Sequence, residues 1–133
     1  MRRIGGRWLM GLVLLIVGTV ASAAEPTKDS LQTVKQNITA GKAVLIDVRE
    51  LDEWNDGHLA GAALLPLSRI ERGVTAEQLA KISPGEKIIY LHCAFGSRSL
   101  NAADLLKRTG RDVRPLKQGY DELRQSGFRA AAK

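Results

Sequence analysis

The sequence has little that would cross-link the chain or bind a metal. Among its 133 residues there is a single cysteine, Cys93, which excludes an intrachain disulfide and a zinc site built from several thiolates. Four prolines and 13 glycines exclude a collagen-like or proline-rich chain, and an apolar share of 44% excludes disorder. The length fits one domain with a core of its own.

The first 23 residues have the three parts of an export signal. They are a basic start with three arginines, the apolar run Trp8–Val20 and a small-residue cleavage site, Ala21-Ser22-Ala23. Because this run is shorter than the roughly 20 residues that span a membrane, we predict a cleaved signal peptide over 1–23. A retained anchor is the alternative. The expected location is periplasmic, with no stable membrane association after cleavage.

Charge and aromatic content limit the class of partner. The net charge is +6, and half of it comes from the three arginines of the predicted signal. A modest positive charge with 5% aromatic residues argues against nucleic-acid binding and is compatible with small anions. In an oxidising compartment, an unpaired cysteine is either buried and inert or present for its chemistry.

Strand and helix patterns alternate along residues 24–133, which we expect to form one domain with its core at about 27–128. Apolar runs predict strands at 43–48, 62–65, 87–93 and 112–116. Helices are predicted at 31–38, 50–57 (a short helix or an ordered loop), 67–82 (two, divided at Gly73), 99–108 and 119–124, with a frayed alanine-rich end. The alternation predicts an α/β fold with a largely parallel sheet, whose strand ends line a ligand site.

One predicted strand ends on Cys93, and a helix is expected to follow after a tight turn. Backbone N–H groups in such a turn point inward and stabilise a thiolate or a bound anion. Gly96 permits the turn, and Arg98 brings a permanent positive charge. These residues favour nucleophilic attack by Cys93 on an anionic substrate. The alternative is a buried, inert cysteine beside a solvated arginine.

Two segments together resemble the rhodanese family. The first runs Asp47-Val48-Arg49-Glu50, Glu53-Trp54, Gly57-His58-Leu59, Gly61-Ala62 and Pro66, and the second is Cys93-Ala94-Phe95-Gly96-Ser97-Arg98-Ser99. They stand in the family's order, and the resemblance covers roughly 27–128. With the export signal, the chain is similar to periplasmic, single-domain, phage-shock-type thiosulfate sulfurtransferases. The resemblance implies a mostly parallel sheet of four to five strands with helices on both faces.

It also implies sulfur transfer through a persulfide on Cys93, the catalytic residue. Thiosulfate would be the donor and cyanide or a thiol the acceptor, with no metal or organic cofactor and a monomeric protein. The expected substrate-binding residues are Arg98, which would hold the sulfonate, and the loop residues Ala94, Phe95, Gly96, Ser97 and Ser99.

Three further residues are candidates for supporting roles, Asp47, Arg49 and His58. We favour structural roles for them: an ion pair of Arg49 with Glu50 or Glu53, backbone bonds of Asp47, and backbone bonds of His58 in its turn. His92 is expected to pack on the face opposite Cys93.

Other functions stay open at this point. They are a non-catalytic binding module, a persulfide carrier fed by another protein, and a phosphatase or arsenate reductase. Related phosphatases and arsenate reductases have a loop one residue longer than Cys93–Arg98. Near the C-terminus, Gln118 and Leu123 stand where the family often has Gly and Trp, which puts the local turn and the pocket edge in doubt.

Overall fold

The computed structural model describes residues 11, 13–18 and 23–133. Most of the predicted signal peptide lies outside the described residues, so its presence and cleavage stay predictions. Within the described ranges, no helix is long and apolar enough to cross a membrane.

Four parallel strands form the central sheet in the order β2-β1-β3-β4. They are Ala43–Asp47 (β1), Ala63–Leu64 (β2), Ile88–His92 (β3) and Val113–Pro115 (β4), which confirms the four predicted strands in slightly shorter form. The lead-in before the first helix meets β4 through a hydrogen bond from the Thr27 N–H to the Pro115 carbonyl. The sheet therefore has the lower of the two expected strand numbers in the described part of the chain.

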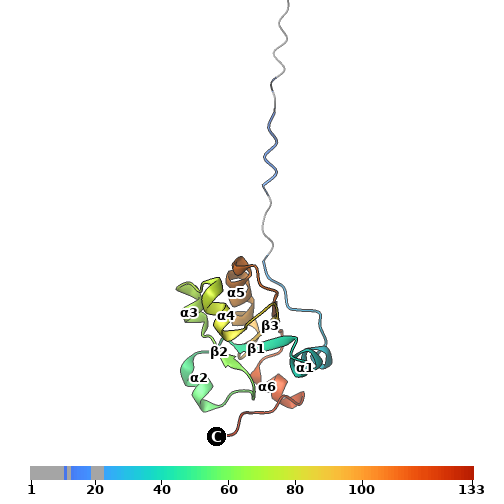
Figure 1. Cartoon of the computed structure of the whole chain (residues 1–133), viewed down its shortest axis with the longest axis vertical. Coiled ribbons are helices and arrows are strands. Elements are labelled where there is room, and N and C mark those ends of the chain that lie inside the picture. Colours follow the sequence, from blue (N-terminus) through green and yellow to red (C-terminus); the bar gives the residue numbers. More distant parts are fainter. Residues whose placement is uncertain (1–10, 12, 19–22) are drawn as a thin grey trace, which may run out of the picture.

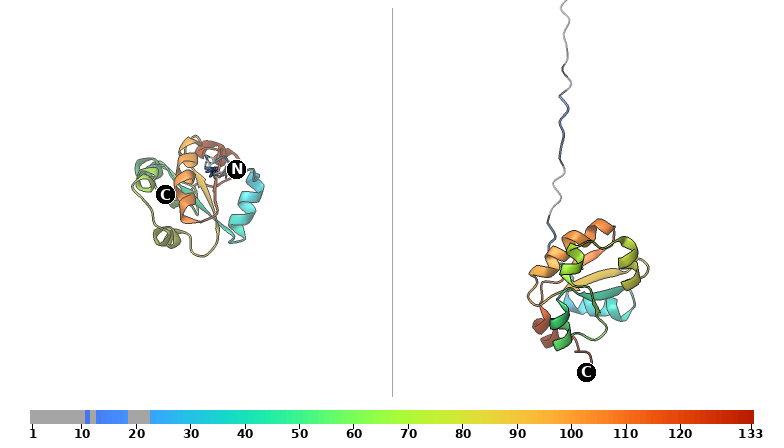
Figure 2. Two further views of the ribbon diagram at one scale, coloured as in Figure 1. Left: turned by 90° about the horizontal axis from the view of Figure 1, so that it is seen from above. Right: turned by 90° about the vertical axis from the view of Figure 1, so that its left-hand side faces the viewer.

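Helices cover both faces of this sheet (Figures 1 and 2). One face carries α1 (Leu31–Thr39) and α6 (Tyr120–Gln125), and the other carries α3 (Leu67–Glu71), α4 (Ala76–Ile82) and α5 (Ser97–Leu106). The remaining elements are α2 (Leu51–Asp56), which follows β1, and the 3-10 turn η1 (Lys107–Thr109), which extends α5.

The helix after the cysteine begins at Ser97, two residues earlier than predicted. Gly96 is its N-cap and has a left-handed backbone conformation, with φ 99°. Glycine adopts this conformation without steric cost, so the chain turns directly from the loop into the helix.

Each face of the sheet has its own apolar core. Leu91 and Cys93 belong to the core beneath α3, α4 and α5. Leu45, Tyr90 and Leu123 belong to the core beneath α1 and α6. Strand β3 is buried on both faces, as its nearly continuous apolar run indicates.

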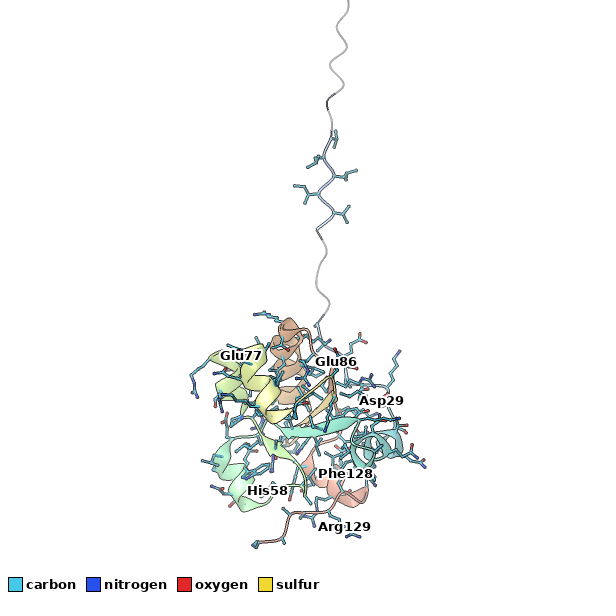
Figure 3. All side chains as sticks on the ribbon, viewed as in Figure 1. Asp29, His58, Glu77, Glu86, Phe128 and Arg129 are labelled. Carbon is cyan, nitrogen blue, oxygen red and sulfur yellow. The ribbon has the colours of Figure 1, made fainter. Side chains whose placement is uncertain are left out.

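Tyr90 ties helix α1 to the sheet through its hydroxyl group. The hydroxyl donates to Asp29 Oδ2 at 2.7 Å and accepts from Asn37 Nδ2 at 2.9 Å. Asp29, just before α1 (Figure 3), also accepts from Arg114 of β4 at 2.9 Å. The hydrogen bond from Tyr90, reinforced by Arg114, lowers the pKa of Asp29.

The alanine-rich end is ordered by pairing, so the prediction that it frays is wrong. The Ala60 N–H donates to the Arg129 carbonyl, and the Ala131 N–H donates to the His58 carbonyl. Leu59 and Ala130 thus form an antiparallel bridge. Backbone pairing between distant segments is not visible in a local pattern of alanines.

We predict that Leu123→Ala lowers the free energy of unfolding by about 2–5 kcal/mol, measured by urea denaturation. Leu123 is fully buried, and its removal leaves a cavity beneath α6. The matched control is Leu51→Ala, at a leucine that is 57% exposed, which should change stability by less than about 0.5 kcal/mol. Equal losses in the two variants would contradict this assignment of the core.

Candidate active site

Cys93 directly follows β3 and is separated from α5 by the three residues 94–96. It is 1% exposed, and its sulfur accepts a hydrogen bond from the Gly96 N–H at 3.0 Å. A backbone N–H directed at sulfur at the start of a ten-residue helix stabilises a negative charge on that sulfur. The loop therefore offers a hydrogen-bond donor to negative charge on the Cys93 sulfur.

Two glycines let the segment after β4 pack against this loop. A Cβ on Gly96 would lie 2.7 Å from the Lys117 carbonyl oxygen, and a Cβ on Gly119 would lie 1.8 Å from the Ala94 carbonyl oxygen. Neither position has space for a side chain. The Tyr120 N–H, at the start of α6, also donates to the Cys93 carbonyl at 3.0 Å.

The other loop residues differ in what they face. Ala94 is half-buried, Ser97 is exposed, and Phe95 is 88% exposed. Ser99 is buried, with its hydroxyl oxygen 2.7 Å from the Gly96 carbonyl oxygen and 3.1 Å from that of Leu116. These two contacts hold the loop against the segment after β4, and the substrate contact expected of Ser99 stays a prediction.

Arg98 is engaged by a carboxylate rather than left open to an anion. Its Nη1 and Nη2 donate to Oε1 and Oε2 of Glu53, at 2.6 and 2.8 Å. This hydrogen bonding is the main reason why the pKa of Glu53 falls to about 2, so the carboxylate is ionised at neutral pH. The pairing of Arg49 with Glu50 or Glu53 expected from the sequence is wrong, because the partner of Glu53 is Arg98.

Arg49 pairs with Asp47 instead. Its Nε and Nη2 donate to the buried Asp47 carboxylate, and Nη2 also donates to the Gly57 carbonyl at 2.8 Å. The guanidinium lies over the Tyr120 ring, 4.3 Å from its centre. Asp47 and Arg49 thus connect the end of β1 to the start of α6, which contacts Cys93. They have the structural roles that we favoured, with a different ion-pair partner.

The two histidines do not touch the Cys93 sulfur. His92 is fully buried, with its Nε2 at 3.6 Å from Asp47 Oδ2, and burial is the main cause that lowers its pKa. His58, at the end of α2 (Figure 3), stacks on Trp54 at 3.6 Å and places Nδ1 3.1 Å from the Trp54 carbonyl oxygen. Its backbone contact was expected, although the carbonyl is in α2 rather than in the following turn.

Among the residues that the structure describes, no three His, Cys, Asp or Glu side chains are grouped to hold a metal ion. The chain matches the family of rhodanese-like domains over residues 30–126, which is most of its length. It belongs to this family.

Individual relatives agree with this placement. The rhodanese domain is 34% identical over 97 residues to the probable adenylyltransferase/sulfurtransferase MoeZ of Mycobacterium tuberculosis, covering 72% of this chain and 24% of that protein. The match thus spans about a quarter of that relative. It is 32% identical over 108 residues to the uncharacterized protein YqhL of Bacillus subtilis, covering 79% and 81% of the two chains.

Among solved structures, the human single-domain sulfurtransferase TSTD1 is 29% identical and superposes with a TM-score of 0.63, covering 77% of this chain and 97% of that one. The four-stranded parallel sheet with its flanking helices is the rhodanese fold. The family and these relatives support a role in sulfur transfer in general.

Two structural features around the Cys93 loop of this rhodanese domain were missed from the sequence. Glu53 was assigned to Arg49, because its actual partner Arg98 is 45 residues away. Gly119 was expected only as the first residue of the last helix. The substitutions at Gln118 and Leu123 leave the loop contacts intact: Gln118 is half-buried, and Leu123 fills the core where the family often has Trp.

We predict that Gly119→Ala displaces the Cys93 loop, because the new methyl group would overlap the Ala94 carbonyl. Backbone strain is not the cause, since the φ of −82° at Gly119 is open to alanine. The expected result is a change of at least about tenfold in the rate of Cys93 alkylation by iodoacetamide.

The control is Gly85→Ala, which has φ 75° and nothing within 4 Å of the new Cβ. It costs about 1–2 kcal/mol of backbone strain and should leave the alkylation rate unchanged. Equal rates in wild type and Gly119→Ala would show that the loop does not depend on this contact.

Proposed function

We propose that this protein is an exported thiosulfate sulfurtransferase that carries sulfur as a Cys93 persulfide. The observation that supports this most directly is the Gly96 N–H, 3.0 Å from the Cys93 sulfur at the start of α5. A cysteine at the end of a strand is not specific to this function, because alternating strands and helices bring many cysteines to such positions. A backbone amide directed at the sulfur is more specific, because it stabilises the negatively charged form of that sulfur. Export rests on the three-part pattern of residues 1–23.

In the first step, the Cys93 thiolate attacks the sulfane sulfur of thiosulfate. A bond forms between Sγ and that sulfur, the S–S bond of thiosulfate breaks, and sulfite leaves with the electron pair. In this proposal, the loop amides of residues 94–98 hold the outer sulfur of the persulfide. The substrate-binding roles of Arg98 and of the loop residues stay predictions.

In the second step, an acceptor attacks the outer sulfur. Cyanide leaves as thiocyanate, or a thiolate leaves as a persulfide, and in both cases the Cys93 thiolate is restored. Neither step needs a redox cofactor or a metal, because the electron pairs move between sulfur atoms and the acceptor.

A persulfide carrier fed by a partner protein is the second candidate. Cys93 is 1% exposed whereas Phe95, two residues along the same loop, is 88% exposed. An exposed aromatic side chain beside a recessed sulfur would give a partner protein an apolar contact at the entrance to the loop. The carrier would share the Cys93 persulfide but would not take its sulfur from thiosulfate.

The intact mass of the reduced protein, recorded before and after thiosulfate, separates these candidates. We expect a gain of about one sulfur atom (~32 Da) that cyanide removes, because the thiolate is the sulfur acceptor. Cys93→Ser should show no gain and should unfold like the wild type. A gain retained in Cys93→Ser would contradict the mechanism, and no gain in a wild type whose thiol is still alkylated would favour the carrier.

Arg98→Ala should lower kcat/KM for thiosulfate at least about tenfold, with a smaller effect on kcat. The substitution leaves the Glu53 carboxylate unpaired beside the loop, where it repels a dianionic donor. The measurement is thiocyanate formation at subsaturating thiosulfate. An unchanged rate would reject a role of Arg98 in the use of the donor.

A further inference from the structure

Arg98 is the cation nearest to Cys93 along the chain. Glu53 accepts hydrogen bonds from both of its terminal nitrogens. Arg98 lies in the first turn of α5, where its charge interacts with that of Cys93. Both terminal nitrogens donate to the two oxygens of Glu53 in a fork. Arginine binds planar and tetrahedral oxyanions through the same pair of parallel hydrogen bonds. A donor anion therefore competes with a carboxylate that is already bound.

Glu53 is fixed in place by its own helix. Glu53 Oε1 also accepts the Glu50 N–H, which forms the capping box at the start of α2. The carboxylate thus needs no reordering to hold Arg98. Glu50 and Arg49 also act on the Glu53–Arg98 ion pair, and their charges are opposite in sign. Whether the positive charge of Arg98 reaches a ligand at Cys93 consequently depends on Glu53.

We infer that Glu53 is a specificity-determining residue, which holds both terminal nitrogens of Arg98 and thereby lowers the preference of the Cys93 loop for anionic donors. Neutral donors lose nothing by this pairing, because they have no charge for Arg98 to attract. Glu53 thus reduces the factor by which the Cys93 loop prefers dianions such as thiosulfate to neutral sulfur donors. The effect of Glu53 on sulfur donors rests on the proposed function. Its effect on the electrostatic potential at the Cys93 thiol does not.

The test compares two alkylating reagents of nearly the same size at Cys93. Iodoacetate is an anion and iodoacetamide is neutral, so the ratio of their rates reports the potential at the sulfur, and the thiolate fraction cancels. Glu53→Gln should raise the iodoacetate-to-iodoacetamide ratio roughly three- to tenfold at low salt and less at 1 M salt. Glutamine keeps an oxygen for the Glu50 N–H, and Glu53→Ala is the second variant should Glu53→Gln fold poorly.

The matched control is Asp52→Asn, the neighbouring exposed carboxylate, which changes the net charge equally. It should leave the ratio within about twofold of the wild type. In the Arg98→Gln background, Glu53→Gln should raise the ratio by a smaller factor than in the wild type, because only the direct repulsion by the carboxylate is then removed. An unchanged ratio in Glu53→Gln, or an equal rise with and without Arg98, would overturn the inference.

With thiosulfate as donor, kcat/KM of Glu53→Gln should rise by a similar factor, and a fall would also overturn the inference. A wild type that gains no sulfur from thiosulfate would contradict the proposed function alone. The alkylation ratios would still decide the role of Glu53, since they require no sulfur transfer.

Discussion

Two backbone segments, residues 93–97 and 116–120, approach each other so closely that no side chain fits between them at Gly96 or Gly119. This contact depends on the parallel pairing of β3 with β4, which brings the ends of the two strands side by side. It holds the turn in which the Gly96 N–H meets the Cys93 sulfur. The chemistry of the loop is therefore a consequence of backbone packing more than of any polar side chain.

Ion pairs attach the segment after β1 to the same edge of the sheet. Asp47 and His92 are register partners, so the buried Asp47–Arg49 pair lies beside the strand that carries Cys93. One residue pair further out, Glu53 and Arg98 join α2 to the first turn of α5. The inner pair is buried and supports the packing of Tyr120, whereas the outer pair is about one third exposed.

Much of the fold was predictable, because its signals are local. The continuous apolar run of β3 indicated a strand buried on both faces, and Gly73 separated α3 from α4 as expected. The start of α5 was placed too late, since the conformation of Gly96 depends on its packing against Lys117. The paired end of the chain was missed because alanines have no pattern that indicates a distant partner.

The sequence alone determined that one cysteine would stand at a strand end before a glycine turn and a helix, since strand periodicity and glycine placement are encoded in neighbouring residues. It did not determine which carboxylate faces which arginine. Glu50 and Glu53 were the candidates for Arg49, and none was named for Arg98. The observed pairs, Arg49 with Asp47 and Arg98 with Glu53, follow from strand register and from the path of α2. Only the tertiary structure decided this, because ion pairs form between side chains that the fold brings together, whatever their separation along the chain.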